Sequence, residues 1–123
     1  MMDKQLAERD LLWMADDDWT GLWEAWWSLQ SAWPELQGEP AVQAAHALLK
    51  DLVARGLVYL CFFEAESNSE TPMSSEVAYE TMEDRKSWEP PDGDKQTIRF
   101  ATTPGGKKEM YKLEAALKAT GRI

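Results

Sequence analysis

The chain has 123 residues, 44% hydrophobic and 28% charged, with a single cysteine. This composition is typical of a globular protein and excludes a disordered chain, and the length suits a single domain over residues 1–123. Cys61 alone excludes an internal disulfide, and no apolar run approaches the roughly 20 residues of a membrane-spanning helix. Because the first ten residues also lack a signal-peptide pattern, we expect a cytoplasmic protein without a membrane partner.

The net charge of −9 is unevenly distributed along the chain. Residues 1–94 contain 6 Lys or Arg and 20 Asp or Glu, a net charge of −14, whereas residues 95–123 contain 7 and 2, a net charge of +5. An acidic body repels nucleic acids and membrane surfaces, while the basic end attracts them. We favour the interpretation that the two parts lie against each other and partly neutralise.

The first predicted helix begins after Asp3 and contains QLAERDLLWMA, with Leu6, Leu12 and Trp13 directed inward. Three aspartates at 16–18 follow. We expect them at the start of the second helix, where carboxylates accept hydrogen bonds from free N–H groups and oppose the positive end of the helix dipole. Adjacent aspartates diverge on a helical turn and no further ligand motif follows, so we predict no metal site there.

Five tryptophans crowd the second predicted helix. At about 100° per residue they share one arc of roughly 160° with Leu22 and Leu29. The five are Trp19, Trp23, Trp26, Trp27 and Trp33. So coherent an apolar stripe indicates a tryptophan-rich core, although an exposed platform for a ligand is the alternative. Trp27, at the edge of the arc, is the ring most open to solvent, and Pro34 ends the helix.

The third helix is the most clearly delimited element, because Pro40 suits the first helical position and Gly56 suits the left-handed position after a last turn. Its predicted inward face is Val42, Ala45, Leu48, Leu49, Leu52 and Val53. Its predicted outward face is Gln43, Ala44, Ala47, Lys50, Asp51 and Ala54. His46 flanks the apolar edge, and a lone histidine without an orienting partner is more often packed than catalytic.

A strand follows directly in LVYLCFFE, whose two alternating sides are both apolar, so both sides should be covered. Residues 67–96 are polar, with one short helix beginning near Ser74. A second strand at 97–103 has Ile98 and Phe100 on its apolar side. Thr103 and Pro104 then start a last helix. Its inward residues are Met110, Leu113 and Leu117, and its outward arc is Lys107, Lys108, Lys112, Lys118 and Arg122.

This order of elements resembles the winged-helix (winged helix-turn-helix) superfamily. ALLKDLVARGLVYL is similar to a third helix that runs through a glycine into the first wing strand, and IRFATTPGGKKEMYKLEAAL to a second wing strand followed by a closing helix. The resemblance implies an α+β, mainly helical fold: three N-terminal helices, a two-stranded wing hairpin enlarged by a helical insertion at 67–96, and a C-terminal helix. It also implies a small strand between the first two helices, for which DDWTG is the available segment.

The resemblance further implies DNA binding, with the third helix in the major groove. Carried over residue by residue, the base-reading positions are the six residues of the outward face. These side chains are poorly suited to reading DNA bases. Contacts to guanine and to phosphates usually require Arg or Lys, and this face has one Lys beside one Asp.

Three kinds of function remain to be weighed. We favour a non-catalytic module that binds an unidentified protein, or a second copy of itself, through an acidic surface. The candidate partner surface is Gln43, Ala44, Ala47, Lys50, Asp51 and Ala54. The apolar strand is a second candidate surface unless 67–96 covers it. The alternative is a DNA-binding regulator. Its candidate contacts are Gln43, Lys50, Lys95, Arg99, Lys107, Lys108, Lys112, Lys118 and Arg122.

An enzyme is the third kind. The sequence has no glycine-rich phosphate loop, no Cys/His metal spacing and no serine elbow, so we predict neither catalytic residues nor a cofactor. A small-molecule pocket lined by tryptophan is a minority alternative.

Overall fold

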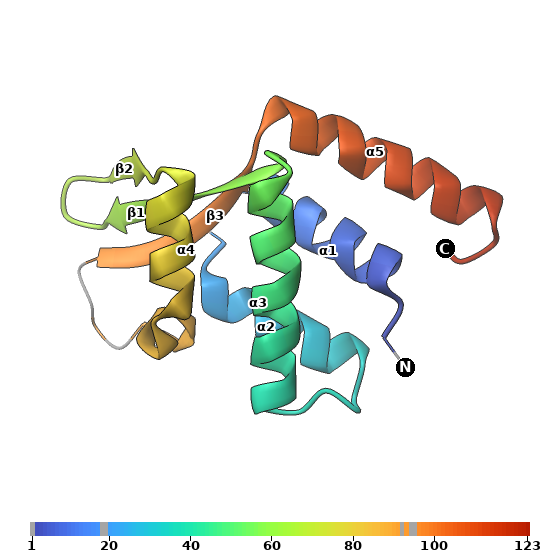
Figure 1. Ribbon diagram of the computed structural model, residues 1–123, viewed down its shortest axis with the longest axis horizontal. Helices are drawn as coiled ribbons and strands as arrows, with labels where there is room; N and C mark the ends of the chain where they lie inside the picture. Colours follow the sequence, from blue (N-terminus) through green and yellow to red (C-terminus); the bar gives the residue numbers. More distant parts are fainter. Residues whose placement is uncertain (1, 18–19, 92, 94–95) are drawn as a thin grey trace.

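A computed structural model describes residues 2–17, 20–91, 93 and 96–123 of the chain. Its elements are α1 (Lys4–Asp16), α2 (Leu22–Ala32), α3 (Glu39–Ala54), β1 (Val58–Glu64), β2 (Ser69–Pro72), α4 (Ser75–Glu83), the 3₁₀ helix η1 (Arg85–Trp88), β3 (Gln96–Thr102) and α5 (Pro104–Ala119) (Figure 1). The expected α+β, mainly helical fold is confirmed. The strand β2 and the turn η1 were not predicted from the sequence.

The strands form one antiparallel sheet in the order β2-β1-β3, with Leu60 opposite Phe100. The segment before α2 joins the sheet only briefly: Gly21 forms an isolated bridge with Arg99, and the Phe100 amide donates to the Thr20 carbonyl at 3.1 Å. The expected extra strand is therefore reduced to a bridge in the described residues. Asp18 and Trp19, which belong to the same segment, lie outside those residues.

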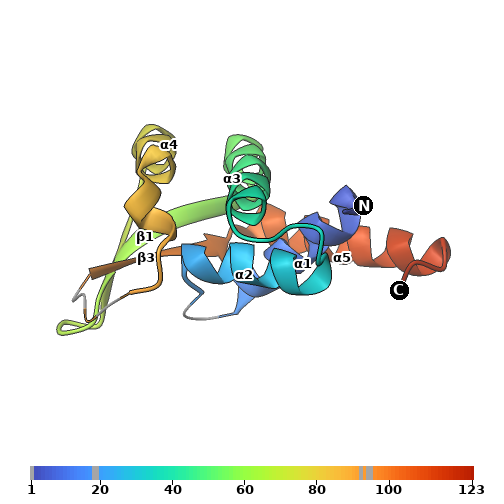
Figure 2. The same cartoon turned by 90° about the horizontal axis from the view of Figure 1, so that it is seen from below.

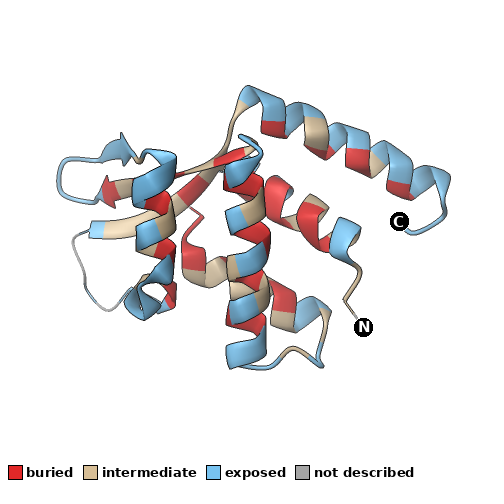
Figure 3. Cartoon of the chain, viewed as in Figure 1, coloured by how far each residue is buried: buried red, intermediate tan, exposed pale blue. Residues whose placement is uncertain are grey.

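The helices fall into two groups around the sheet. α3 and α4 lie side by side and project from the same side of the molecule, whereas α5 lies along α1 at the other end (Figures 1 and 2). Buried residues line the facing sides of all these elements (Figure 3). The predicted inward faces of α3 and α5 are confirmed, since all nine of their residues are buried. On α1, Leu12 is buried, but the prediction for Trp13 is wrong because Ala7, Leu11 and Ala15 take the inward side.

The tryptophans of α2 flank the core instead of filling it. The fully buried residues of α2 are Leu22, Ala25 and Leu29, which let α2 approach α3 closely. Trp23, Trp26 and Trp33 are half-buried and Trp27 is 49% exposed, as expected for the edge of the arc. The prediction of a core made of these rings is therefore wrong in its full form. An indole is large and has an N–H that needs an acceptor, so it is stable at a margin where that acceptor is in reach.

The aspartates at 16–18 do not cap α2. Asp16 is the last residue of α1 and Asp17 is its C-cap, so the capping prediction is wrong for both; Asp18 lies outside the described residues. The first turn of α2 is stabilised instead by Glu24, whose Oε2 accepts from the Gly21 amide at 2.6 Å. The reason is that the chain first runs beside β3 at residues 20–21, and this bridge delays the start of the helix.

Most of the residues predicted to begin or end the other helices do so in the structure. Gly56 has φ of +72° after α3, as predicted. Pro40 is the second residue of that helix, one position later than predicted, because α3 begins at Glu39. Thr103 caps α5: its Oγ1 accepts from the Gly106 amide at 3.0 Å and donates to the Gly56 carbonyl at 2.7 Å. One hydroxyl thus joins the end of α3 to the start of α5. α2 ends at Ala32, before Pro34, and Ser74 caps α4.

The insertion at 67–96 is anchored by Trp88, which is only 2% exposed. Its Nε1 donates to the Met82 carbonyl at 2.8 Å, and its own carbonyl accepts from Trp26 Nε1 at 2.7 Å. Its ring lies 5.6 Å from the ring of His46 on α3. The α4–η1 part of the insertion is therefore packed on α2 and α3, where Trp88, Ala78 and Met82 belong to the core.

Among the residues that the structure describes, no helix has both the length and the apolar character that crossing a bilayer requires.

Candidate functional site

The outward face of α3 is largely open. Gln43, Ala47, Lys50 and Ala54 are exposed, whereas Ala44 is half-buried against the core. Asp51 is also half-buried, and its Oδ2 lies 3.1 Å from Nη1 of Arg55, which also pairs with Glu8 and Glu109. The predicted partner surface is therefore one continuous strip of small and polar side chains.

Helix α4 adds a row of carboxylates beside this strip. Glu83 Oε1 lies 3.5 Å from His46 Nε2, and Glu39 forms an ion pair with Arg85 just beyond α4. Glu76 and Glu80 lie seven and three residues before Glu83, so they share its side of the helix. All three glutamates are exposed, and Val77 between them is 40% exposed.

These two helices together present what we call the α3–α4 face. It consists of Gln43, Ala47, Lys50 and Ala54 from α3 and Glu76, Val77, Glu80 and Glu83 from α4. Sequence reasoning found the α3 half. It missed the α4 half, because the contact between residues 46 and 83 is a tertiary one with no local pattern.

The basic arc of α5 is exposed as predicted, but it lies elsewhere. α5 packs along α1, away from α4 and the β1–β2 hairpin (Figure 1). Lys107 Nζ lies 3.8 Å from Asp16, Lys118 Nζ 3.8 Å from Glu114, and Arg122 Nη1 2.9 Å from Asp3. Lys108 and Lys112 are also exposed. Two of these pairs join the basic end to the acidic body, in agreement with the expected partial neutralisation.

The remaining candidate nucleic-acid contacts are dispersed as well. Arg99 lies across a ring of β1, with its Cζ 3.5 Å from the Phe63 centroid, and burial lowers the pKa of its guanidinium. Lys95 lies outside the described residues. The structure therefore brings Gln43 and Lys50 together on α3 but separates them from the arc of α5.

The side of the sheet that carries Arg99 also holds Cys61, which is 1% exposed. Burial raises the pKa of the Cys61 thiol, and nearby Glu70 raises it further. A reactive cysteine needs the opposite shift, because the thiolate is the nucleophile. A small cavity of about 220 Å³ borders Cys61, Tyr59 and Arg99. On this side of β1, Cys61 and Phe63 are buried and Tyr59 is half-buried.

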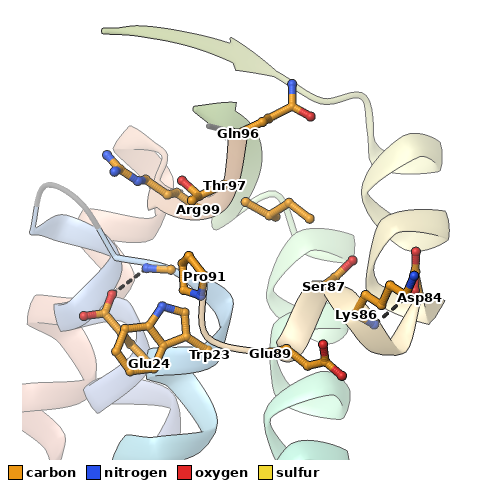
Figure 4. A pocket seen from close by; sticks show the side chains of 12 residues that line it. Trp23, Glu24, Asp84, Lys86, Ser87, Glu89, Pro91, Gln96, Thr97 and Arg99 are labelled. Carbon is orange, nitrogen blue, oxygen red and sulfur yellow. Dashed lines mark hydrogen bonds between the residues drawn. The ribbon is translucent and has the colours of Figure 1, made fainter. Parts of the chain in front are cut away.

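A larger cavity of about 380 Å³ opens between α2, η1 and β3 (Figure 4). Its lining includes Trp23 of α2, Ser87 of η1, Pro91 of the segment before β3, and Thr97 and Ile98 of β3. Its charged residues are two cations, Lys86 and Arg99, and three carboxylates, Glu24, Asp84 and Glu89. Glu24 and Asp84 accept hydrogen bonds from helix-start amides, so their charges serve local structure.

In the described part of the chain, no group of three or more His, Cys, Asp or Glu is arranged to hold a metal ion. No protein-family model, no curated protein and no solved structure matches this chain. The functional proposal therefore rests on the geometry of the α3–α4 face and of the cavity beside β3.

Proposed function

We propose that this chain is a non-catalytic binding module on a winged-helix-like frame, and that the α3–α4 face contacts another protein. Two features support the frame. The elements follow the order of helix, short pairing segment, two helices and a wing of antiparallel strands. The pairing segment meets the last wing strand, through Gly21 and Arg99, as a small strand between the first two helices would.

The observation that carries the proposal is the position of α4 directly beside α3. The major groove is about 12 Å wide and admits one helix, which with side chains measures about 10–12 Å. Here two neighbouring helices project from the same side of the molecule (Figure 2). If α3 entered a groove, α4 would meet the backbone, where duplex DNA carries a negative charge every 1.7 Å or so. Its row of Glu76, Glu80 and Glu83 opposes that contact.

The same features suit a protein partner. Ala47 and Ala54 leave room for a close approach of another backbone, and Val77 of α4 adds an exposed apolar side chain. Acidic side chains around such a strip favour partners with a basic rim, which raises the rate of association and excludes acidic competitors. The module needs no reactive group for this role.

We expect a photo-crosslinking residue at position 47 to capture a protein from the source cell, and the same residue at position 115 to capture none. Ala47 and Ala115 are matched, since both are exposed alanines on helices, one on the α3–α4 face and one on α5. The measurement is mass spectrometry of the crosslinked species, with and without prior nuclease digestion.

A product specific to position 47 that survives the nuclease supports the proposal. Crosslinks to nucleic acid, or products that disappear with the nuclease, contradict it in favour of the DNA-binding alternative. Equal capture at positions 47 and 115 contradicts the assignment to this face.

A further inference from the structure

The outer edge of β3 is only partly paired. The Phe100 amide points outward, where it donates to the Thr20 carbonyl. In an antiparallel ladder the N–H and C=O groups alternate between the two sides of a strand, so those of Ile98 and Gln96 point to the same outer edge. The bridging segment ends at Gly21 because α2 begins with the next residue. The bridge of Gly21 with Arg99 also places the Leu22 amide against the Ile98 carbonyl. Within the described residues, the groups of this edge without a backbone partner are therefore the Ile98 amide and the amide and carbonyl of Gln96.

This free edge forms one wall of the cavity of about 380 Å³ (Figure 4). A second polar group there also lacks a partner: Oγ1 of Thr97 is inaccessible to solvent and makes no hydrogen bond in the described structure. Buried polar groups are normally hydrogen-bonded, so an unpaired one is unfavourable until a ligand or water supplies the partner. Opposite the edge stands the half-buried indole of Trp23.

We infer that this cavity binds a short extended peptide segment of a partner protein, which adds to β3 as a further strand. The unpaired amides of Ile98 and Gln96 repeat at strand spacing, about 6.8 Å apart for alternate residues, and the carbonyls of an extended backbone match that spacing. Such a segment would lie on the same edge as the bridge of Gly21, nearer to Gln96. Its side chains would contact Trp23 on one side.

Size and charge define the peptide further. A volume of about 380 Å³ lies near the lower end of the usual range for binding sites, about 300–1,000 Å³, so the segment is a few residues long. Three carboxylates against two cations in the lining disfavour an anionic ligand such as a nucleotide. The segment is therefore uncharged or basic. The site is separate from the α3–α4 face, so either proposal can fail without the other.

The test is to select end-capped hexapeptides from a synthetic library on the full chain and to measure their affinity for two proline variants. Gln96→Pro removes an outward-pointing N–H at the exposed start of β3, a position that tolerates proline. Glu70→Pro is the matched control: the register of β1 and β2 turns the Glu70 amide to the opposite, outer edge of the sheet.

We expect selected peptides to bind the wild type and Glu70→Pro equally and to lose at least tenfold in affinity for Gln96→Pro. Methylation of alternate peptide amides should abolish binding, and the Ile98 amide should become protected from hydrogen exchange. The inference is overturned if no peptide binds more tightly than 1 mM or so, a free energy of about −4.1 kcal/mol. It is equally overturned if Gln96→Pro binds the peptides as tightly as the wild type does. The same holds if, in an NMR titration with the peptide, the backbone amides whose signals shift lie on the α3–α4 face.

Discussion

Replacing Trp88 with alanine lowers the free energy of unfolding by about 3–5 kcal/mol, the usual range for a large buried aromatic side chain. Trp88 is 2% exposed, and its indole N–H satisfies the carbonyl of Met82 at the end of α4. The variant loses this hydrogen bond and the contact of the Trp88 ring with the ring of His46, 5.6 Å away. Denaturant unfolding followed by far-UV circular dichroism measures the change.

Trp27→Ala is the matched control, because Trp27 is also a tryptophan but is 49% exposed on α2. It should lose less than about 1 kcal/mol, since surface substitutions are usually small in effect. Equal losses for the two variants would mean that the insertion is not anchored through Trp88. Because Trp88 also holds α4 against α3, Trp88→Ala should weaken any crosslink formed at position 47.

Gly106→Ala should destabilise the protein by about 3 kcal/mol, the upper part of the range for overpacking. A methyl group on Gly106 would overlap the carbonyl group of Leu57, which also accepts from the Thr103 amide at 3.1 Å. This obstacle is backbone, so it cannot move aside as the end of a flexible side chain does. The start of α5 would have to shift away from β1.

The neighbouring glycine provides the control for this prediction. A methyl group on Gly105 would meet only ordinary contacts, at 3.7 Å from Thr103 Oγ1 and 3.9 Å from Leu57 Cδ2. Gly105→Ala should therefore raise stability by about 0.5–1 kcal/mol through its better helix propensity. Thermal and denaturant unfolding of the pair should give shifts of opposite sign, and shifts of the same sign would contradict the close packing of α5 on Leu57.

The best-predicted element is α3, because two independent signals agree there. Its limiting residues, Pro40 and Gly56, and its apolar repeat from Val42 to Val53 indicate the same helix, and the structure confirms both. The buried residues of α2 were predicted less well. Tryptophans outnumber leucines on its apolar arc, and the arc does not tell which of the two kinds of side chain is fully buried. Small residues such as Ala25 decide how closely two helices pack. An arc defined by hydrophobicity alone gives no information on side-chain size, so it did not single out Ala25 as a buried position.

The features of the insertion at 67–96 could not be predicted from local sequence patterns. β2 has the sequence SETP and is exposed throughout. It therefore lacks the alternation of polar and apolar residues that indicates a strand. Trp88 stands alone among polar residues, with no periodic neighbours to indicate that it is buried. The acidic row of α4 and the strip on α3 are separated by some 30 residues of sequence, so only the folded chain unites them.

The measurement that decides most directly between α3 as part of a protein-binding face and α3 as a DNA-reading helix is a titration of the full chain with a mixed-sequence DNA duplex. Fluorescence anisotropy reports the binding at about 50 mM salt, where phosphate contacts are strong. Because the glutamate row of α4 opposes contact with the DNA backbone, we predict no saturable binding up to about 10 µM protein. This concentration lies within the usual range of dissociation constants for non-specific DNA binding, about 1–100 µM. Micromolar or tighter binding that weakens steeply with salt and is lost in Lys50→Glu would contradict this prediction, because α3 would then enter the groove despite α4.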